Sequence, residues 1–249
     1  MEKADAPSSS KSDIVLPALD GVIPELLPDK DRVYYNDYST LVQQQGMLQD
    51  HVRTSLYQFA MLENTGDFKG KTVLDVGAGS GILSFFAAKA GAKKVYAVEA
   101  SGMAAKAEKL AAGNGLSDVV EVINKKVEDV TLDERVDVLI SEPLGIALVN
   151  ERMLESYLRA RDALLKPGGK MFPDRATLFA APFSDDALYQ EQYQKAGFWT
   201  QPNFFGVDLS PLRDDALNFY YSQPVVGPVA PHTIVASASG KNFDFTSMT

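Results

Sequence analysis

A glycine-rich turn between two apolar runs constrains this chain more than any other feature. Residues 71–101 read KTVLDVGAGSGILSFFAAKAGAKKVYAVEAS. The run at residues 72–76 suits a buried parallel strand, and three alternate glycines follow it. Residues 82–89 have helical composition, and residues 94–98 form a second apolar run that Glu99 closes. This order predicts the strand, turn, helix and strand that open a nucleotide-binding α/β sheet.

The glycine spacing discriminates between nucleotide ligands. A dinucleotide fingerprint needs G-x-G-x-x-G, but the third position here is Ile82. Alternate glycines just after Asp75 fit S-adenosylmethionine (SAM) better, because SAM has no phosphate and less need of a helix N-terminus. Glu99 stands where such folds hold ribose hydroxyls. For the glycines alone, an ordinary tight strand-to-helix turn is the plain alternative.

Composition excludes several classes of function. The 249 residues include 24 basic and 33 acidic ones, a net charge of −9 that argues against general affinity for nucleic acid or anionic membranes. With no cysteine and two histidines, we expect no metal site. No apolar run is long enough to span a bilayer, and the N-terminus lacks a signal-peptide block. We therefore expect an intracellular, soluble protein.

Helices and strands are predicted on both sides of the opening unit. Residues 1–30 contain the polar patch SSSKS, and their prolines interrupt any helix, which is typical of a flexible tail. Residues 33–64 carry apolar side chains at helical spacing, and residues 103–112 form an alanine-rich helical segment. The third and fourth strands are expected at residues 119–127 and 136–140.

Carboxylates follow these two later strands. Glu128 comes after the third, where it could accept a hydrogen bond from an adenine amine or equally be a solvated loop acid. Glu142 ends the fourth strand, and Glu151 opens the next helix after the uncharged residues 143–150. Alone, Glu151 is better explained as an acid at a helix start. As a pair, the two acids could hold a guanidinium at an apolar pocket mouth.

Beyond Pro173 the sequence changes character. A strand is expected at residues 177–183 and a helix at residues 185–196. Residues 198–212 are rich in aromatic and turn residues, and short β-like stretches follow to residue 249. These strands are too few to close a sheet by themselves.

Together these segments resemble the protein arginine methyltransferase family, most closely its coactivator-associated (CARM-type, type I) branch. The resemblance covers about residues 33–226 and includes MLQDHVRT, VLDVGAGSGILS, YAVEAS, KVEDV, SEPLG…NERMLESYL and FWTQPNFFGVDLSPLR, in this order. It implies an α/β fold: a Rossmann-like SAM-binding sheet with N-terminal helices, then an incomplete β-barrel carrying a helical dimerisation arm. The implied domains are a tail (1–30), a methyltransferase domain (31–174) and a partial barrel (175–249) with the arm at about 186–224.

The resemblance also implies an activity and partners. SAM would be the methyl donor and a guanidinium nitrogen of protein arginine the acceptor, with asymmetric dimethylarginine as the expected product. Expected partners are arginine-containing proteins such as histones and a second copy of the chain, without direct nucleic-acid or membrane partners, in nucleus and cytoplasm. The alternatives are a SAM-binding, dimerising fragment without turnover, a SAM-dependent methyltransferase of another substrate and, more distantly, an NAD dehydrogenase.

Residue roles follow from the matched motifs. Glu142 and Glu151 resemble the catalytic pair that grips the substrate guanidinium. Tyr34 and Tyr38 would close over the site, and Arg53 would bind the methionine carboxylate of SAM. The cofactor-binding residues are expected to be Gln44, Met47, Arg53, Asp75, Gly77, Gly79, Glu99, Glu128 and Ser156.

Three departures from the family pattern stand out. Ala78 replaces the usual cysteine, and Ile146 stands where a tyrosine is usual. Members also carry a downstream Thr-His-Trp loop, whose histidine pairs with an aspartate that matches Asp50. Here His232 lies between proline and threonine, and Trp199 is the only tryptophan. We therefore expect the front part of a longer enzyme, with weak or absent turnover by itself.

Overall fold

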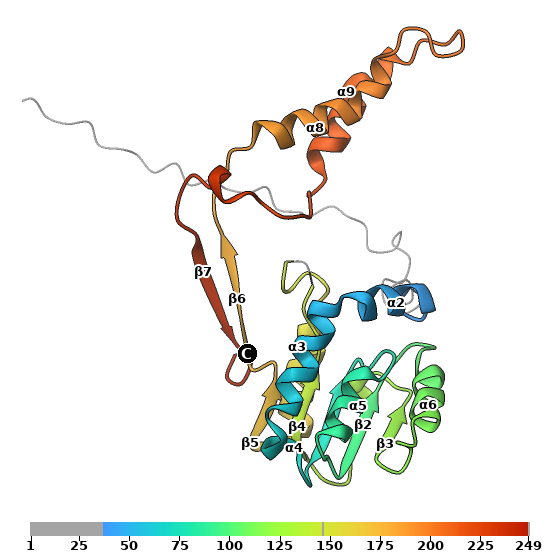
Figure 1. The fold of residues 1–249 in the computed structure, drawn as a ribbon, viewed down its shortest axis with the longest axis vertical. Helices are drawn as coiled ribbons and strands as arrows, with labels where there is room; N and C mark the ends of the chain where they lie inside the picture. The colour runs from blue at the N-terminus through green and yellow to red at the C-terminus, as the bar shows by residue number, and fades with distance from the viewer. Residues whose placement is uncertain (1–36, 146, 249) are drawn as a thin grey trace, which may run out of the picture.

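The computed structural model describes residues 37–145 and 147–248, so the expected tail, Tyr34 and Ile146 lie outside the described residues. A parallel five-stranded sheet forms the centre of the fold, in the order β3-β2-β1-β4-β5 (Figure 1). The strand order reverses beside β1, and such a reversal opens a ligand crevice at the carboxyl ends of the strands. The strands are β1 (Thr72–Val76), β2 (Lys94–Val98), β3 (Val120–Ile123), β4 (Val136–Ser141) and β5 (Leu165–Phe172).

Helices cover both faces of this sheet. One buried cluster joins it to α3 (His51–Leu62), α4 (Thr65–Phe68), α5 (Ile82–Lys89) and α6 (Ala104–Gly113). A second cluster joins the opposite face to α7 (Met153–Leu164). Burial on two faces requires apolar residues at successive strand positions, which is why the strands were recognisable as continuous runs.

In the core, three expected boundaries were wrong. The helical segment at residues 33–64 is broken at Asp50. This residue follows α2 (Leu41–Gln49), and its side chain caps α3 by accepting from the Arg53 N–H at 2.9 Å. The strand expected at residues 119–127 ends at Ile123, because the Asn124 amide turns back to the backbone oxygens of Glu99 and Ser101. Residues Val127–Asp129 instead form a 3-10 turn, η2.

The third wrong boundary is the start of α7. Glu151 was expected to open this helix, but α7 begins at Met153. Arg152 occupies the position before the helix with φ of 60°, a conformation that costs energy for a residue with a Cβ. Glu151 therefore belongs to the preceding loop, and its side chain is positioned by that loop rather than by a helical turn.

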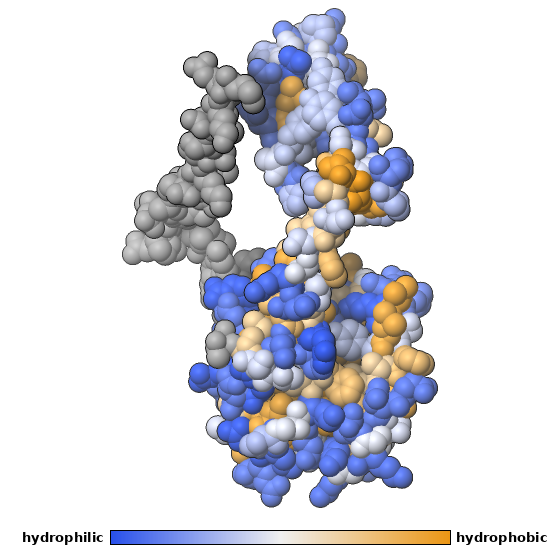
Figure 2. Space-filling view, turned by 90° about the vertical axis from the view of Figure 1, so that its left-hand side faces the viewer, coloured by the Kyte–Doolittle hydropathy of each residue, from blue (hydrophilic) through white to orange (hydrophobic). Residues whose placement is uncertain are grey.

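The part beyond Pro173 extends away from the core as a ribbon and a helical pair (Figure 1). β6 (Arg175–Ala180) pairs antiparallel with β7 (Ser239–Asp244), and between them lie α8 (Asp186–Ala196) and α9 (Arg213–Ser222). The space-filling view shows a narrow neck between the core and the projecting helices, with apolar surface on both parts (Figure 2).

Two expectations concern this projecting part. The strand expected at residues 177–183 is shorter and begins earlier, at Arg175, whereas the helix expected at residues 185–196 is confirmed. The two strands of the ribbon do not test the predicted barrel or the domain boundaries, which stay predictions.

Asp75 is a carboxyl group buried inside the sheet. Its side chain is fully buried, and Oδ2 accepts a hydrogen bond of 2.7 Å from the Ser84 hydroxyl of α5. Oδ1 has no hydrogen-bond partner among the described residues. Burial raises the pKa of Asp75 to about 7, although the bond from Ser84 opposes the rise. Below that pH the site therefore holds a neutral acid.

We predict that Asp75 makes the protein less stable as the pH rises towards neutrality. Its folded pKa lies above the unfolded value of about 3.9, so the stabilising proton is fully present below the unfolded value and lost through pH 7. Between these two pH limits, the free energy of unfolding of Asp75→Asn should rise relative to that of the parent by about 1.4 kcal/mol per pH unit. Urea unfolding at several pH values measures this difference. A parent and variant whose stabilities run parallel with pH would contradict the assignment.

Candidate functional site

An open pocket lies at the carboxyl ends of the central strands, covered by residues of α2 and bounded by the loop before α7. It holds about 1050 Å³ of empty space, its open mouth included. Asp75 lies beneath it rather than in its lining, because that side chain points into the core. The other expected site residues that the structure describes all line the pocket: Tyr38, Gln44, Met47, Arg53, Gly77, Gly79, Glu99, Glu128, Glu142, Glu151 and Ser156.

The glycine turn forms one wall of the pocket. Two of its positions require glycine for two reasons, the backbone conformation and the lack of room for a side chain. Gly77 and Gly79 have φ of 70° and 55°, in the left-handed region that favours glycine. A Cβ on Gly77 would also collide with the methyl group of Met153, and one on Gly79 would lie 2.9 Å from Gln44 Oε1. Side chains from α2 and α7 can therefore approach the turn only because it has no side chains there.

Glu99 holds this turn against the end of β2. Its Oε2 accepts the Gly79 N–H at 2.8 Å, and its Oε1 accepts the Ser101 N–H at 2.7 Å. The side chain is nearly buried and still reaches the pocket. Since each carboxylate oxygen can accept more than one hydrogen bond, Glu99 keeps acceptor capacity for a hydroxyl-bearing ligand.

Glu128 and Ser156 form a pair that the sequence did not predict. Glu128 lies in η2, and Ser156 lies on α7. The Ser156 hydroxyl donates to Glu128 Oε1 at 2.6 Å, and both side chains line the pocket. This contact fixes the Glu128 carboxylate in the lining of the pocket.

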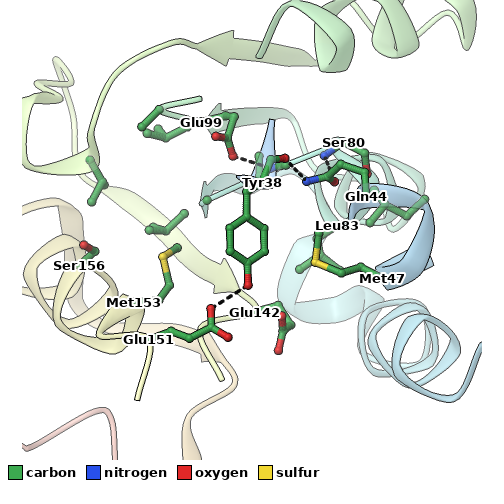
Figure 3. Close-up of a pocket in the computed structure, with 18 of the residues that line it drawn as sticks. Tyr38, Gln44, Met47, Ser80, Leu83, Glu99, Glu142, Glu151, Met153 and Ser156 are labelled. Atoms are coloured by element: carbon green, nitrogen blue, oxygen red, sulfur yellow. Dashed lines mark hydrogen bonds between the residues drawn. The ribbon is translucent and has the colours of Figure 1, made fainter. Parts of the chain in front are cut away.

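The two acids of the expected guanidinium site lie at the same end of the pocket (Figure 3). Glu142 Oε2 lies 2.6 Å from Nη2 of Arg53, and the Tyr38 hydroxyl donates to Glu151 Oε2 at 2.9 Å. Burial raises the pKa of Glu142 above its usual value, and the charge of Glu151 adds to this rise. The hydrogen bond from Arg53 acts in the opposite direction and favours the carboxylate.

Some lining residues carried no recognisable signal in the sequence. Met153 reaches the pocket from the first turn of α7, and Lys125 and Lys126 line it just after β3. A methionine at a helix start and a lysine pair in a loop are ordinary surface patterns, so only the folded arrangement shows their place. Within the part of the chain that the structure describes, no group of His, Asp and Glu could hold a metal ion, and no helix could span a membrane.

Comparison with known proteins adds independent evidence. The family model described as "Ribosomal protein L11 methyltransferase (PrmA)" matches residues 50–171, the segment that contains the parallel sheet. A "Probable histone-arginine methyltransferase CARM1" from Oryza sativa subsp. indica is 56% identical over 218 residues, which is 87% of this chain and 41% of the relative. The "Histone-arginine methyltransferase CARMER" of Anopheles gambiae is 58% identical over 78% of this chain and 31% of the relative. The chain thus spans less than half of these curated relatives.

Solved structures give the same result. A chain of the "Trypanosoma brucei PRMT1 enzyme-prozyme heterotetrameric complex with AdoHcy" is 39% identical with a TM-score of 0.74, covering 86% of this chain and 65% of that one. The Arabidopsis thaliana protein arginine methyltransferase 10 is 38% identical with a TM-score of 0.74, covering 87% and 66%. These likenesses agree with the motif order and with the glycine turn, parallel sheet and paired glutamates described above. The chain belongs to the protein arginine methyltransferase family.

Proposed function

We propose that this chain is the cofactor-binding and arginine-binding part of a SAM-dependent protein arginine N-methyltransferase. The observation that carries the proposal is one pocket with two differently equipped ends. A glycine turn held by Glu99 forms one region, and the carboxylates of Glu142 and Glu151 stand together in another. The names of the relatives and the AdoHcy of the trypanosome complex support the same assignment.

The residues present fit SAM. The Glu99 carboxylate offers hydrogen-bond acceptors at the position where this fold binds ribose hydroxyls. The Glu128 carboxylate offers an acceptor for the adenine amine. Gly77 and Gly79 leave the backbone of the turn accessible, and the guanidinium of Arg53 suits the methionine carboxylate. When bound, SAM supplies a methyl group already activated by its sulfonium sulfur.

The paired glutamates perform the chemistry that the chain itself contributes. Glu142 and Glu151 accept hydrogen bonds from the substrate guanidinium and draw its positive charge towards two of its nitrogens. The third nitrogen is thereby oriented towards the methyl group. A free guanidinium is not deprotonated at neutral pH, so the proton leaves with or after methyl transfer.

Arg53 has two functions in this scheme. It neutralises Glu142 at 2.6 Å, which favours the carboxylate although burial raises its pKa. It also reaches the same pocket as the expected ligand of the methionine carboxylate. The cofactor end and the arginine end are thus joined electrostatically by one guanidinium that stays charged at all relevant pH values.

Substrates and location follow from the proposed chemistry. The histone-arginine names of the relatives support histones and other arginine-containing proteins as substrates, and a nuclear role. Asymmetric dimethylarginine as the product and an additional cytoplasmic pool stay predictions, as do domain boundaries at residues 30 and 174. Membership of a methyltransferase family excludes the NAD dehydrogenase alternative, whereas a fragment without turnover is an outcome of the activity test.

A homodimer through the arm (about residues 186–224) is the proposed assembly. In the arm, Phe198, Trp199, Phe204 and Phe205 form edge-to-face contacts, and Phe205 is 94% exposed. A second set of exposed apolar side chains lies elsewhere, on α2 and α3. Its exposed members are Leu41, Val42, Val52, Leu56 and Phe59. Apolar patches of this kind suit an interface, and we propose that the arm of one copy covers the helices of the other.

The cofactor assignment predicts the effect of Glu99→Ala. The variant loses the acceptor for ribose hydroxyls and for two backbone N–H groups, which should weaken binding of S-adenosylhomocysteine by about 1.5–3 kcal/mol. Titration calorimetry measures this change. Glu121→Ala, an exposed glutamate on the neighbouring β3, is the matched control and should bind as the parent does. Equal affinities for all three proteins would count against the site.

The catalytic assignment predicts that Glu142→Gln separates the two ends of the pocket. The variant should keep its affinity for S-adenosylhomocysteine within about threefold but bind an arginine peptide at least tenfold more weakly, because it loses a charged hydrogen bond of about 1.5–3 kcal/mol. Calorimetry measures the affinity for S-adenosylhomocysteine and then, with S-adenosylhomocysteine present, the affinity for the arginine peptide. A lysine peptide and the exposed Glu108→Gln variant are the controls.

Mass spectrometry after incubation with SAM tests the activity itself. Methylated arginine in the peptide, and none in the lysine peptide, would support the proposed function. Transfer by the Glu142→Gln variant at the parental rate would overturn its catalytic role. Product binding without any transfer by the parent would favour the alternative of a cofactor-binding fragment.

The assembly proposal predicts a shift in sedimentation. Trp199→Ala combined with Phe205→Ala removes two aromatic side chains from the arm and should move a dimeric parent towards monomer. Phe179→Ala, an exposed phenylalanine on β6, is the control and should leave the distribution unchanged. The arm is not the interface if the double variant and the parent both sediment as dimers.

A further inference from the structure

Three consecutive glutamines occupy α2, and their surroundings differ. Gln43 and Gln45 are exposed, whereas Gln44 is buried with 5% of its surface accessible. Helix propensity is the same for the three, so it does not explain the burial of an amide that must then be hydrogen-bonded. The contacts of Gln44 therefore indicate a specific role.

The Gln44 amide makes two hydrogen bonds to different parts of the pocket. Its Oε1 accepts the Ser80 N–H at 3.0 Å, and its Nε2 donates to the backbone oxygen of Tyr38 at 3.0 Å (Figure 3). The absence of a side chain on Gly79 makes room for this amide. One buried group thus ties the glycine turn to the segment that carries Tyr38.

Each of these two partners leads to a binding group. On one side, Gly79, next to Ser80, donates its N–H to Glu99 at 2.8 Å. On the other side, the Tyr38 hydroxyl donates to Glu151 at 2.9 Å. A continuous series of contacts therefore runs from the cofactor end of the pocket to one of the two acids of the arginine end, and Gln44 is its middle member.

We infer that Gln44 is a positioning residue, which transmits the order of the glycine turn through Tyr38 to Glu151. This inference rests on the proposed function and adds a dependence between its two binding events. A ligand that orders residues 79–80 fixes the Gln44 amide, and the amide then holds Tyr38 where its hydroxyl orients Glu151. By linkage, arginine binding strengthens cofactor binding by the same factor as cofactor binding strengthens arginine binding.

One substitution separates the two bonds of the amide. Gln44→Glu keeps an oxygen that can accept from Ser80, but it places a second oxygen against the Tyr38 carbonyl where a donor stood. The turn should therefore still be held, whereas Tyr38 is released. Gln45→Glu makes the same chemical change on the exposed side of α2 and is the matched control.

Hydrogen–deuterium exchange of the 249-residue chain, with and without S-adenosylhomocysteine, measures backbone protection at both ends of the pocket in one experiment. In the parent and in Gln45→Glu, the ligand should slow exchange at residues 77–84 and at residues 144–153 by about fivefold or more, the effect of one added hydrogen bond. In Gln44→Glu the slowing should persist at residues 77–84 and disappear at residues 144–153. Because the readout is the ligand-dependent difference, a general loosening of α2 does not mimic it.

Tyr38→Phe provides a second test that does not touch α2. It removes only the hydroxyl that contacts Glu151, so protection at residues 144–153 should be lost and protection at residues 77–84 kept. Protection at residues 144–153 that survives in Gln44→Glu or in Tyr38→Phe would overturn the inference. If the ligand protects the parent only at residues 77–84, the inference is also overturned, but the proposed function is left intact. A parent protected at neither segment would overturn the cofactor site and the inference together.

Discussion

The hydrogen bonds between Glu99 and the glycine turn are the constraint on which the rest of the site depends. They join the ends of two neighbouring parallel strands, because Gly79 follows β1 and Glu99 follows β2. Left-handed backbone at Gly77 and Gly79 makes this geometry accessible, and the bare turn admits Gln44 and Met153 from two different helices. The sheet thus brings a carboxylate, a turn and two helices into one set of contacts.

At the other end of the pocket, stability and function make opposite demands on charge. Glu142 is placed where burial disfavours its ionised form, and the nearby charge of Glu151 increases that cost. Arg53 offsets the cost for Glu142, and the Tyr38 hydroxyl supplies a neutral donor to Glu151. Each acid is therefore held by a different kind of partner, a cation for Glu142 and a phenol for Glu151.

The sequence predicted the elements whose signal is local. Strands buried on both faces, the glycine turn and the acid after β2 are each encoded within a few residues, and their order identified the family. The long-range contacts were not predictable in this way. Arg53 and Glu142 are 89 residues apart, and Ser156 and Glu128 are 28 apart, so no local pattern shows that they touch. The end of β3 also depends on Asn124 reaching the residues after another strand, and the burial of Gln44 between two exposed glutamines depends on its distant partners.

The position of the single tryptophan has a practical consequence. Trp199 packs edge-on against Phe198 at a ring distance of 5.3 Å, in the 3-10 turn (Gly197–Thr200) that follows α8. Figure 1 shows α8 in the projecting part, away from the sheet that carries the pocket. Tryptophan emission from this chain therefore reports the surroundings of the arm, whereas among the described residues the aromatic side chain that lines the pocket is that of Tyr38. The natural tryptophan fluorescence of the protein is therefore a selective optical probe of the proposed association surface and responds little to what enters the pocket.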